Sequence, residues 1–176
     1  MDVTEQKFAL ITGCSTGGIG RAMAKHLHQH GFYVFATARD TSKISDIDSK
    51  NAEFLELDVT VPSTIERCRD LVSRRTGGRL DVLVNNAGVE FNSPLLDINV
   101  AEAKKLYEVN VWGPLLMVQA FAPLLKEAKG VIFNQSSMDS ALNMVWAGKS
   151  SKSHPYMMLL SWQCTLHRKA RLTLVM

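Results

Sequence analysis

The chain has 176 residues, which is enough for one sizeable domain and too few for two ordinary ones. Hydrophobic residues make up 46% and charged residues 21%, a balance that excludes a disordered, collagen-like or disulfide-framework chain. The three cysteines, Cys14, Cys68 and Cys164, lack CxxC spacing and favour reduced thiols in a cytosolic compartment over a metal site. We expect neither a secretory signal before Lys7 nor a membrane-spanning run of about 18 apolar residues.

Charge is distributed unevenly along the chain. No acidic residue follows Asp139, whereas five of the 20 basic residues do: Lys149, Lys152, Arg168, Lys169 and Arg171. Residues 1–148 keep 15 basic against 17 acidic residues, a formal charge of −2. The positive net charge therefore comes from residues 149–176, and the body of the chain gives no support for a nucleic-acid partner.

Short apolar runs alternate with helical periods from Lys7 onward. The sequence predicts strands over residues 8–11, 33–37, 54–57, 80–84 and 131–134. It predicts helices over residues 19–30, 62–75 and 100–126. Gly31 would cap the first helix in the left-handed conformation, and Pro62 suits the first turn of the second. Strands that alternate with helices predict an α/β fold, a doubly wound parallel sheet of the Rossmann type.

A glycine-rich segment separates the first expected strand from the first helix. It reads Thr12-Gly13-Cys14-Ser15-Thr16-Gly17-Gly18-Ile19-Gly20. An open α/β sheet binds the pyrophosphate of a dinucleotide at this place, because glycines let the backbone approach the phosphates and the helix N-terminus supplies free N–H groups. The sequence therefore predicts a dinucleotide site, since a tight turn alone would not need so many glycines.

Arg39 lies at the end of the second expected strand. A cofactor without a 2′-phosphate would require a carboxylate about 20 residues after the glycines, to accept a hydrogen bond from the ribose. A guanidinium at this place pairs with a 2′-phosphate instead. Asp40 follows, and we expect its side chain to point to the other side of the loop. The sequence favours NADP(H) over NAD(H); the alternative is that Arg39 is a solvated surface residue.

With Asn85-Asn86-Ala87-Gly88 after the fourth strand, residues 7–148 resemble the short-chain dehydrogenase/reductase family, although the glycine loop is one residue longer than usual. The loop and the segment 34–39 are most similar to fungal NADPH-dependent 1-acyldihydroxyacetone-phosphate reductases. The resemblance implies cofactor-binding roles for Gly13, Ser15, Thr16, Gly18, Ile19, Gly20, Arg39, Asp58, Val59, Asn86, Ala87 and Gly88.

The resemblance also implies catalytic roles for Ser137 and Asn110. Ser137 would hydrogen-bond the carbonyl oxygen of a ketone, and Asn110 would hold a water in a proton relay. Asn86 would link the fourth and fifth strands beside the cofactor. The alternatives are that Ser137 is a cap and that Asn110 is a satisfied polar group inside a helix.

The family's Tyr-x-x-x-Lys motif, which supplies the proton donor, is absent from the chain. Ser150 stands where the tyrosine is expected, and Tyr156 is followed by Leu160 four residues later. Codons for residues 156–163 read two bases out of frame can encode Tyr-Asp-Ala-Ser-Lys-Leu-Ala. We hypothesise that residues 1–148 are an incomplete NADP-binding domain, truncated after the fifth strand, and that 149–176 are an atypical tail from a frameshift or a misread intron.

Three functions stay open at this point, and whether the chain is an active enzyme is undecided. The first is an NADPH-dependent reductase of a lipid-linked ketone such as 1-acyldihydroxyacetone phosphate, impaired in this chain. The second is a non-catalytic nucleotide-binding protein, and the third is a peripheral membrane module whose basic tail lies on anionic lipid. We expect self-association through an exposed edge at Val131, Ile132 and Phe133. The expected location is the cytoplasm, where the surface of the endoplasmic reticulum or of lipid droplets is one candidate place.

Overall fold

Five parallel strands form the centre of the computed structural model. The structure describes residues 6–44, 47, 50–90, 93–136 and 146–147. The strands of this sheet are β1 (Phe8–Ile11), β2 (Tyr33–Ala38), β3 (Ala52–Glu56), β4 (Val82–Asn85) and β6 (Val131–Asn134). Their order is β3-β2-β1-β4-β6, and every neighbouring pair is parallel. The expected doubly wound parallel sheet is confirmed, with its topological switch point between β1 and β4.

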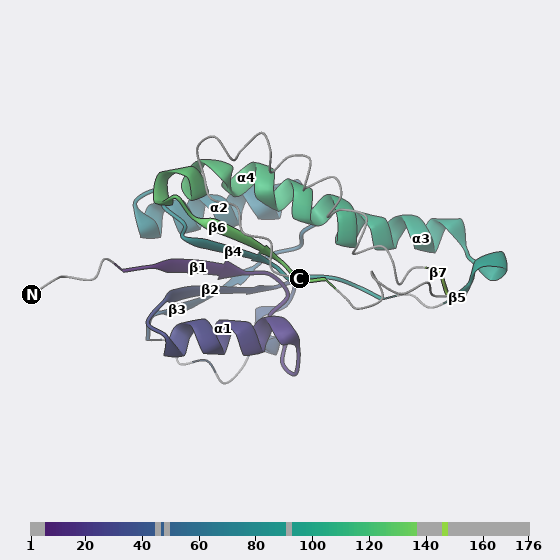
Figure 1. Ribbon diagram of the computed structural model, residues 1–176, viewed down its shortest axis with the longest axis horizontal. Coiled ribbons are helices and arrows are strands. Elements are labelled where there is room, and N and C mark those ends of the chain that lie inside the picture. Colours follow the sequence, from purple (N-terminus) through teal and green to yellow (C-terminus); the bar gives the residue numbers. More distant parts are fainter. Residues whose placement is uncertain (1–5, 45–46, 48–49, 91–92, 137–145, 148–176) are drawn as a thin grey trace, which may run out of the picture.

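Helices cover both faces of this sheet (Figure 1). Helix α1 (Ile19–Gln29) lies on one face, and α2 (Pro62–Thr76) and α4 (Gly113–Ala128) lie on the other. Gly31 follows the end of α1 with φ +83°, the left-handed conformation that the sequence predicts for it. The layers therefore form from helices whose ends are marked in the sequence.

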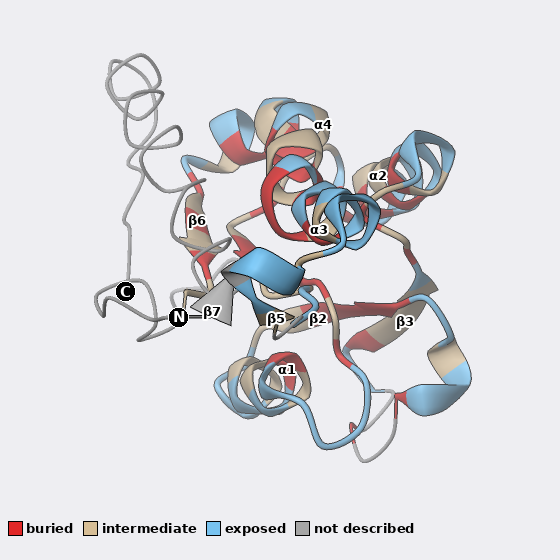
Figure 2. Cartoon of the chain, turned by 90° about the vertical axis from the view of Figure 1, so that its right-hand side faces the viewer, coloured by how far each residue is buried: buried red, intermediate tan, exposed pale blue. Residues whose placement is uncertain are grey.

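The core has two parts because side chains alternate along each strand. On β1, Leu10 packs toward α2 and α4 in one apolar cluster, together with Phe35 of β2. Ala9 and Ile11 point to the opposite face, where they share a second cluster with Ala24 of α1. All of these residues are completely buried, and Figure 2 shows how the buried residues concentrate in the sheet and on the inner sides of the helices.

Two strands begin at residues other than those predicted. β3 begins at Ala52, two residues early, because Ala52 pairs in parallel with Val34. β4 begins at Val82 instead of residue 80, because Leu80 lies before the strand and donates its N–H to the carbonyl oxygen of Leu124 at 3.1 Å. Pairing partners distant in the sequence decide these ends, so local composition does not locate them.

The long helix predicted over residues 100–126 is interrupted. It consists of α3 (Val100–Tyr107), a π-helical turn η3 (Glu108–Trp112) and α4. The N–H of Gly113 donates to the carbonyl oxygen of Glu108, five residues earlier. Pro114 explains the wider turn, since proline has no N–H and its ring clashes with the carbonyl four residues back in a regular α-helix.

Strand β6 is an edge of the described sheet, but its side chains are not exposed as we expected. Ile132 is only 7% exposed, and Val131 and Phe133 are half-buried. Side chains of a strand point to the two faces of the sheet, which the helices cover, and only backbone groups point along the edge. The prediction of an exposed apolar edge is therefore wrong for the side chains.

Four short elements complete the described chain. A 3₁₀ turn η1 (Thr41–Lys43) follows β2, and a second, η2 (Leu95–Asp97), precedes α3. Strands β5 (Ser93–Pro94) and β7 (Trp146–Ala147) form a separate antiparallel pair that the sequence does not predict. None of the described helices has the length and apolarity needed to cross a membrane.

Candidate functional site

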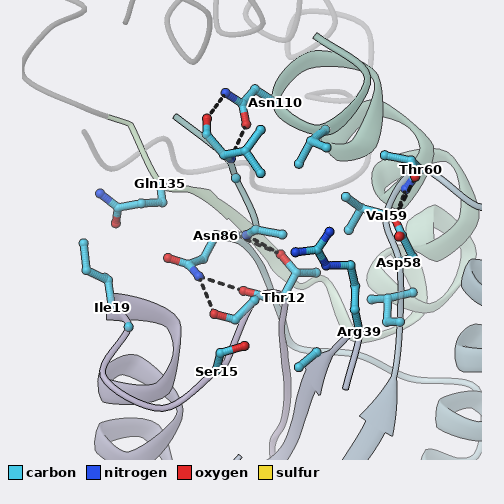
Figure 3. Close-up of a pocket in the computed structure, with 18 of the residues that line it drawn as sticks. Thr12, Ser15, Ile19, Arg39, Asp58, Val59, Thr60, Asn86, Asn110 and Gln135 are labelled. Carbon is cyan, nitrogen blue, oxygen red and sulfur yellow. Dashed lines mark hydrogen bonds between the residues drawn. The ribbon is translucent and has the colours of Figure 1, made fainter. Parts of the chain in front are cut away.

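A cavity of about 600 Å³ opens at the carboxyl ends of the five parallel strands (Figure 3). Most of its lining residues follow directly after these strands, where a doubly wound sheet places its ligands. The lining residues are Thr12, Gly13, Ser15, Gly18, Ile19, Ala38, Arg39, Leu57, Asp58, Val59, Thr60, Asn86, Ala87, Gly88, Val89, Glu90, Val109, Asn110, Gln135 and Ser136.

The cavity brings together every cofactor residue named from the sequence except Thr16 and Gly20, and it also contains Asn110. Ser137 lies outside the described residues. The sequence analysis missed nine lining residues, each within two positions of one that it named. They are Thr12, Ala38, Leu57, Thr60, Val89, Glu90, Val109, Gln135 and Ser136.

Glycine is required at two positions of the loop because the backbone passes close to its neighbours there. A Cβ on Gly13, whose φ is +73°, would lie 2.9 Å from the Cα of Ala87. A Cβ on Gly20 would lie 2.6 Å from the carbonyl oxygen of Gly13 and would overlap the amide of Asn86. The loop and the segment after β4 therefore pack backbone to backbone, and any larger residue would push them apart.

Thr12 and Asn86 hold these two segments together. The hydroxyl of Thr12 accepts hydrogen bonds from the N–H groups of Asn86 (3.0 Å) and Ala87 (2.9 Å). In return, the Asn86 amide donates to the carbonyl oxygens of Thr12 (2.8 Å) and Gly13 (3.1 Å). A threonine hydroxyl can serve as donor and acceptor at once, which suits this position between two backbone segments.

The link that we expected Asn86 to make between the fourth and fifth strands belongs to Asn85. The Asn85 amide donates to the side-chain oxygen of Asn134 at 2.9 Å, and these two residues face each other in the β4–β6 register. Successive side chains of a strand point to opposite faces, so Asn85 and Asn86 cannot share this role. The strand link that the sequence analysis gave to Asn86 is therefore made by the preceding residue, Asn85.

The N-terminus of α1 offers an anion-binding position at the cavity. Gly18 precedes the helix in an extended conformation and makes no side-chain cap, and the first turn contains no acidic residue. Ser15 and Ile19 line the cavity on either side of it. A helix N-terminus directs N–H groups and the positive end of the helix dipole outward, so this position suits a phosphate group.

Arg39 and Asp40 point to different sides, as the sequence predicts for Asp40. The Arg39 side chain extends into the cavity from the end of β2 (Figure 3). Asp40 instead caps η1, accepting hydrogen bonds from the N–H (3.0 Å) and the hydroxyl (2.6 Å) of Ser42. These bonds, together with the charge of Lys43, hold the pKa of Asp40 below its usual value. The cavity thus has a guanidinium, and no carboxylate from this pair, at the end of β2.

Asp58 is fixed at the end of β3. Its carboxylate accepts hydrogen bonds from the N–H (2.9 Å) and hydroxyl (2.7 Å) of Thr60, and its own N–H donates to the hydroxyl of Thr64 at 3.2 Å. Val59 is buried beside it and contacts α4, where a Cβ on Gly113 would lie 2.8 Å from its side chain. Hydrogen bonds and close packing therefore hold Asp58 and Val59 at this side of the cavity.

Asn110 lies in the π-helical turn and is 97% buried. Its amide donates to the carbonyl oxygen of Val89 at 2.8 Å, and its side-chain oxygen accepts from the N–H of Val89 at 2.9 Å. Both functional groups of the side chain thus hold the backbone that follows Gly88 in the cavity wall.

A comparison with protein families agrees with this geometry. The family model for short chain dehydrogenases matches residues 7–170. The chain belongs to the short-chain dehydrogenase family. The match extends beyond residue 148, where our sequence analysis ended the domain.

Individual members of the short-chain dehydrogenase family are also similar. A short-chain dehydrogenase of Talaromyces islandicus is 49% identical over 148 residues, 84% of this chain and 52% of that protein. The NADPH-dependent 1-acyldihydroxyacetone phosphate reductase of Schizosaccharomyces pombe is 40% identical over 135 residues, 77% of this chain and 46% of that protein. The chain therefore spans about half the length of these curated relatives.

A solved structure has the same fold. A metagenomic short-chain oxidoreductase in complex with NADP superimposes with a TM-score of 0.85 and 34% sequence identity, over 96% of this chain and 80% of that one. The likeness covers the parallel sheet whose carboxyl end holds the cavity.

Cys14 lies inside the glycine loop of this short-chain dehydrogenase but does not face the cavity. It is completely buried, its thiol donates to the carbonyl oxygen of Ile11, and burial raises the thiol pKa to about 12. A thiol in this environment stays protonated at neutral pH and does not act as a nucleophile. Among the described residues, no three histidine, cysteine or acidic side chains are grouped closely enough to hold a metal ion.

Proposed function

We propose that this chain binds NADP(H) in the cavity at the carboxyl ends of the strands. The glycine loop and the N-terminus of α1 would hold the pyrophosphate, since they combine the positive end of a helix with close backbone approach. Arg39 would hold the 2′-phosphate as a bidentate donor, and Asp58 with Val59 would border the adenine. The residues present fit such a cofactor, because the cavity has a cationic end and a close-packed glycine wall.

The observation that carries this proposal is the opposite orientation of Arg39 and Asp40. The Asp40 carboxylate accepts hydrogen bonds from Ser42 and does not line the cavity, so the end of β2 presents the positive charge of Arg39 to it. A ribose 2′-hydroxyl would prefer the carboxylate, whereas a 2′-phosphate requires the guanidinium. This supports NADP(H) over NAD(H).

We further propose that the reaction is reduction of a ketone attached to a lipid. The named reductase of Schizosaccharomyces pombe supports 1-acyldihydroxyacetone phosphate as the first substrate to test. Bound NADPH supplies the hydride, while Ser137 would hydrogen-bond the carbonyl oxygen. Asn110, whose side chain is engaged by Val89, would act by positioning the cavity wall.

We propose that catalysis by the 176-residue chain is impaired. No tyrosine in the sequence has a lysine four residues later, so the family's proton donor is missing from it. General acid catalysis typically contributes about 10²–10⁴-fold to the rate. This observation favours, as the second candidate, a protein that binds the cofactor without turning it over.

Binding and turnover should be measured separately on the purified chain. We expect saturable quenching or enhancement of NADPH fluorescence, with a weaker response to NADH, and no ketone-dependent NADPH oxidation above background with 1-acyldihydroxyacetone phosphate. Absence of NADPH binding would contradict the proposed function, and turnover at an ordinary enzymatic rate would contradict the proposed impairment. A version with the frame restored from codon 149 should recover reductase activity.

A further inference from the structure

The segment that carries Arg39 is tied to the glycine loop on both sides of that residue. On one side, the N–H of Cys14 donates to the carbonyl oxygen of Thr37 at 2.8 Å. On the other side, Thr16 donates to the carbonyl oxygen of Lys43 twice, from its N–H at 2.7 Å and from its hydroxyl at 2.6 Å. Arg39 therefore lies between two points that the loop holds.

The carbonyl oxygen of Lys43 is a well-fixed acceptor. It ends the turn η1, in which the N–H of Lys43 donates to the carbonyl oxygen of Asp40 at 3.2 Å. The next residue, Ile44, is 92% buried in the cluster between α1 and the sheet. The turn η1 thus starts beside Arg39, is followed by the buried Ile44, and presents the Lys43 carbonyl oxygen to the glycine loop.

Thr16 is fixed from the side of the loop as well. It lies between Ser15, which lines the cavity, and Gly17, which has φ +82°. The N–H of Gly18 donates to the carbonyl oxygen of Ser15 at 3.0 Å, and α1 starts directly afterwards. Thr16 does not line the cavity itself, so its hydroxyl connects the loop with the Arg39 segment and does not reach the ligand directly.

We propose that Thr16 is a positioning residue for cofactor choice: its hydroxyl, bound to the Lys43 carbonyl, fixes the separation between the glycine loop and Arg39. The inference rests on the proposed function, because it assumes that the loop takes the pyrophosphate and Arg39 the 2′-phosphate. NADPH would engage both elements at once, so it gains when their separation is set before binding. NADH lacks the 2′-phosphate that Arg39 would hold, so the same restraint matters little for it.

The test compares Thr16→Val with Thr16→Ser by titrating the full chain with NADPH and NADH. Valine keeps the shape and the backbone hydrogen bond but removes the hydroxyl, whereas serine retains it. We expect Thr16→Val to weaken NADPH binding by about 2- to 10-fold, the range of one neutral hydrogen bond, with little change for NADH. Thr16→Ser should bind NADPH like the unaltered chain. Thr41→Val, on the same turn, is the matched control and should bind both cofactors normally.

A double-mutant cycle with Arg39→Ala separates positioning from a general loss of structure. If Thr16 acts through Arg39, Thr16→Val should have no further effect on NADPH affinity once Arg39 is alanine. Equal weakening of NADPH and NADH, or additive effects of the two substitutions, would overturn the inference. Unchanged NADPH affinity of the Thr16→Val chain would also overturn it. If Arg39→Ala alone weakened NADPH binding, the proposed function would still hold. A chain that binds neither cofactor would overturn both. If Thr16→Val has a lower urea midpoint than the unaltered chain, Thr16→Ala takes its place in the cycle and is judged by the same outcomes.

Discussion

Asn110 and the backbone of Val89 exchange two hydrogen bonds, 2.8 and 2.9 Å long, across 21 positions of the sequence. The exchange joins the π-helical turn η3 to the strand-end segment that borders the cavity. A regular α-helix through residues 108–112 would rotate Asn110 relative to Val89, so the wider turn and the hydrogen bonds belong together. The cavity wall after Gly88 is therefore held by a side chain from a distant helix.

Replacing Asn110 with alanine should destabilise the chain. The substitution removes the two hydrogen bonds between the Asn110 side chain and the backbone of Val89; one such bond contributes about 0.5–1.5 kcal/mol, so the two together contribute about 1–3 kcal/mol. Urea denaturation should report a loss in this range, with NADPH affinity reduced as well. Asn99→Ala is the control, because Asn99 caps the exposed start of α3 and its loss should lower stability without affecting NADPH. Equal effects of both substitutions on NADPH affinity would contradict the role of Asn110.

Arg39→Ala should weaken or remove the preference for NADPH. Charge-assisted hydrogen bonds are worth about 1.5–3 kcal/mol, so NADPH affinity should fall by about tenfold or more, while NADH affinity stays nearly the same. Fluorescence titration with both cofactors measures the ratio. Arg39→Lys keeps the charge but loses the planar guanidinium, so its NADPH affinity should lie between those of the unaltered chain and Arg39→Ala. Equal losses for NADPH and NADH would show that Arg39 does not contact a 2′-phosphate.

Gly20→Ala should damage both stability and cofactor binding. The added Cβ would press on the Gly13 carbonyl and the Asn86 amide, and overpacking of this kind costs about 1–3 kcal/mol. Gly31→Ala is a matched control at the other end of α1, since its φ of +83° strains alanine but its Cβ would meet nothing within 4 Å. We expect Gly31→Ala to lower the urea midpoint and to bind NADPH normally. The prediction fails if Gly20→Ala binds NADPH as well as Gly31→Ala does.

The thiols of Cys14 and Cys68 should resist alkylation in the folded chain. Both are buried, and burial raises each pKa from 9.0 to about 12. Iodoacetamide at pH 8, followed by peptide mass spectrometry, should label neither residue until urea is added. The raised pKa values also make stability depend on pH: the contribution is complete below pH 9 and is lost as the pH rises from 9 toward 12. Rapid labelling of Cys14 at pH 8 would show that the loop opens.

Motifs next to strand ends were predictable because they depend on residues adjacent in the chain. The glycine loop follows β1, Arg39 follows β2, and Asp58 follows β3, each at the carboxyl end of its strand. Parallel strands bring these ends to one edge of the sheet, so strand positions alone predict that these residues meet. The opposite orientation of Asp40 was also expected, since its side chain follows that of Arg39 in the alternation of an extended backbone.

Only the tertiary structure decides which groups pair across this edge. Asn85 and not Asn86 reaches Asn134, 49 positions away, because the register of β4 against β6 places them opposite each other. The attachment of Thr16 to Lys43 likewise depends on how a turn after β2 folds back on the loop. The order of residues determined the α/β fold and the kinds of chemical group at the site, because hydrophobic periodicity and turn residues are local signals. It did not determine hydrogen-bond partners, because these depend on register and side-chain direction, which are fixed when distant segments pack together.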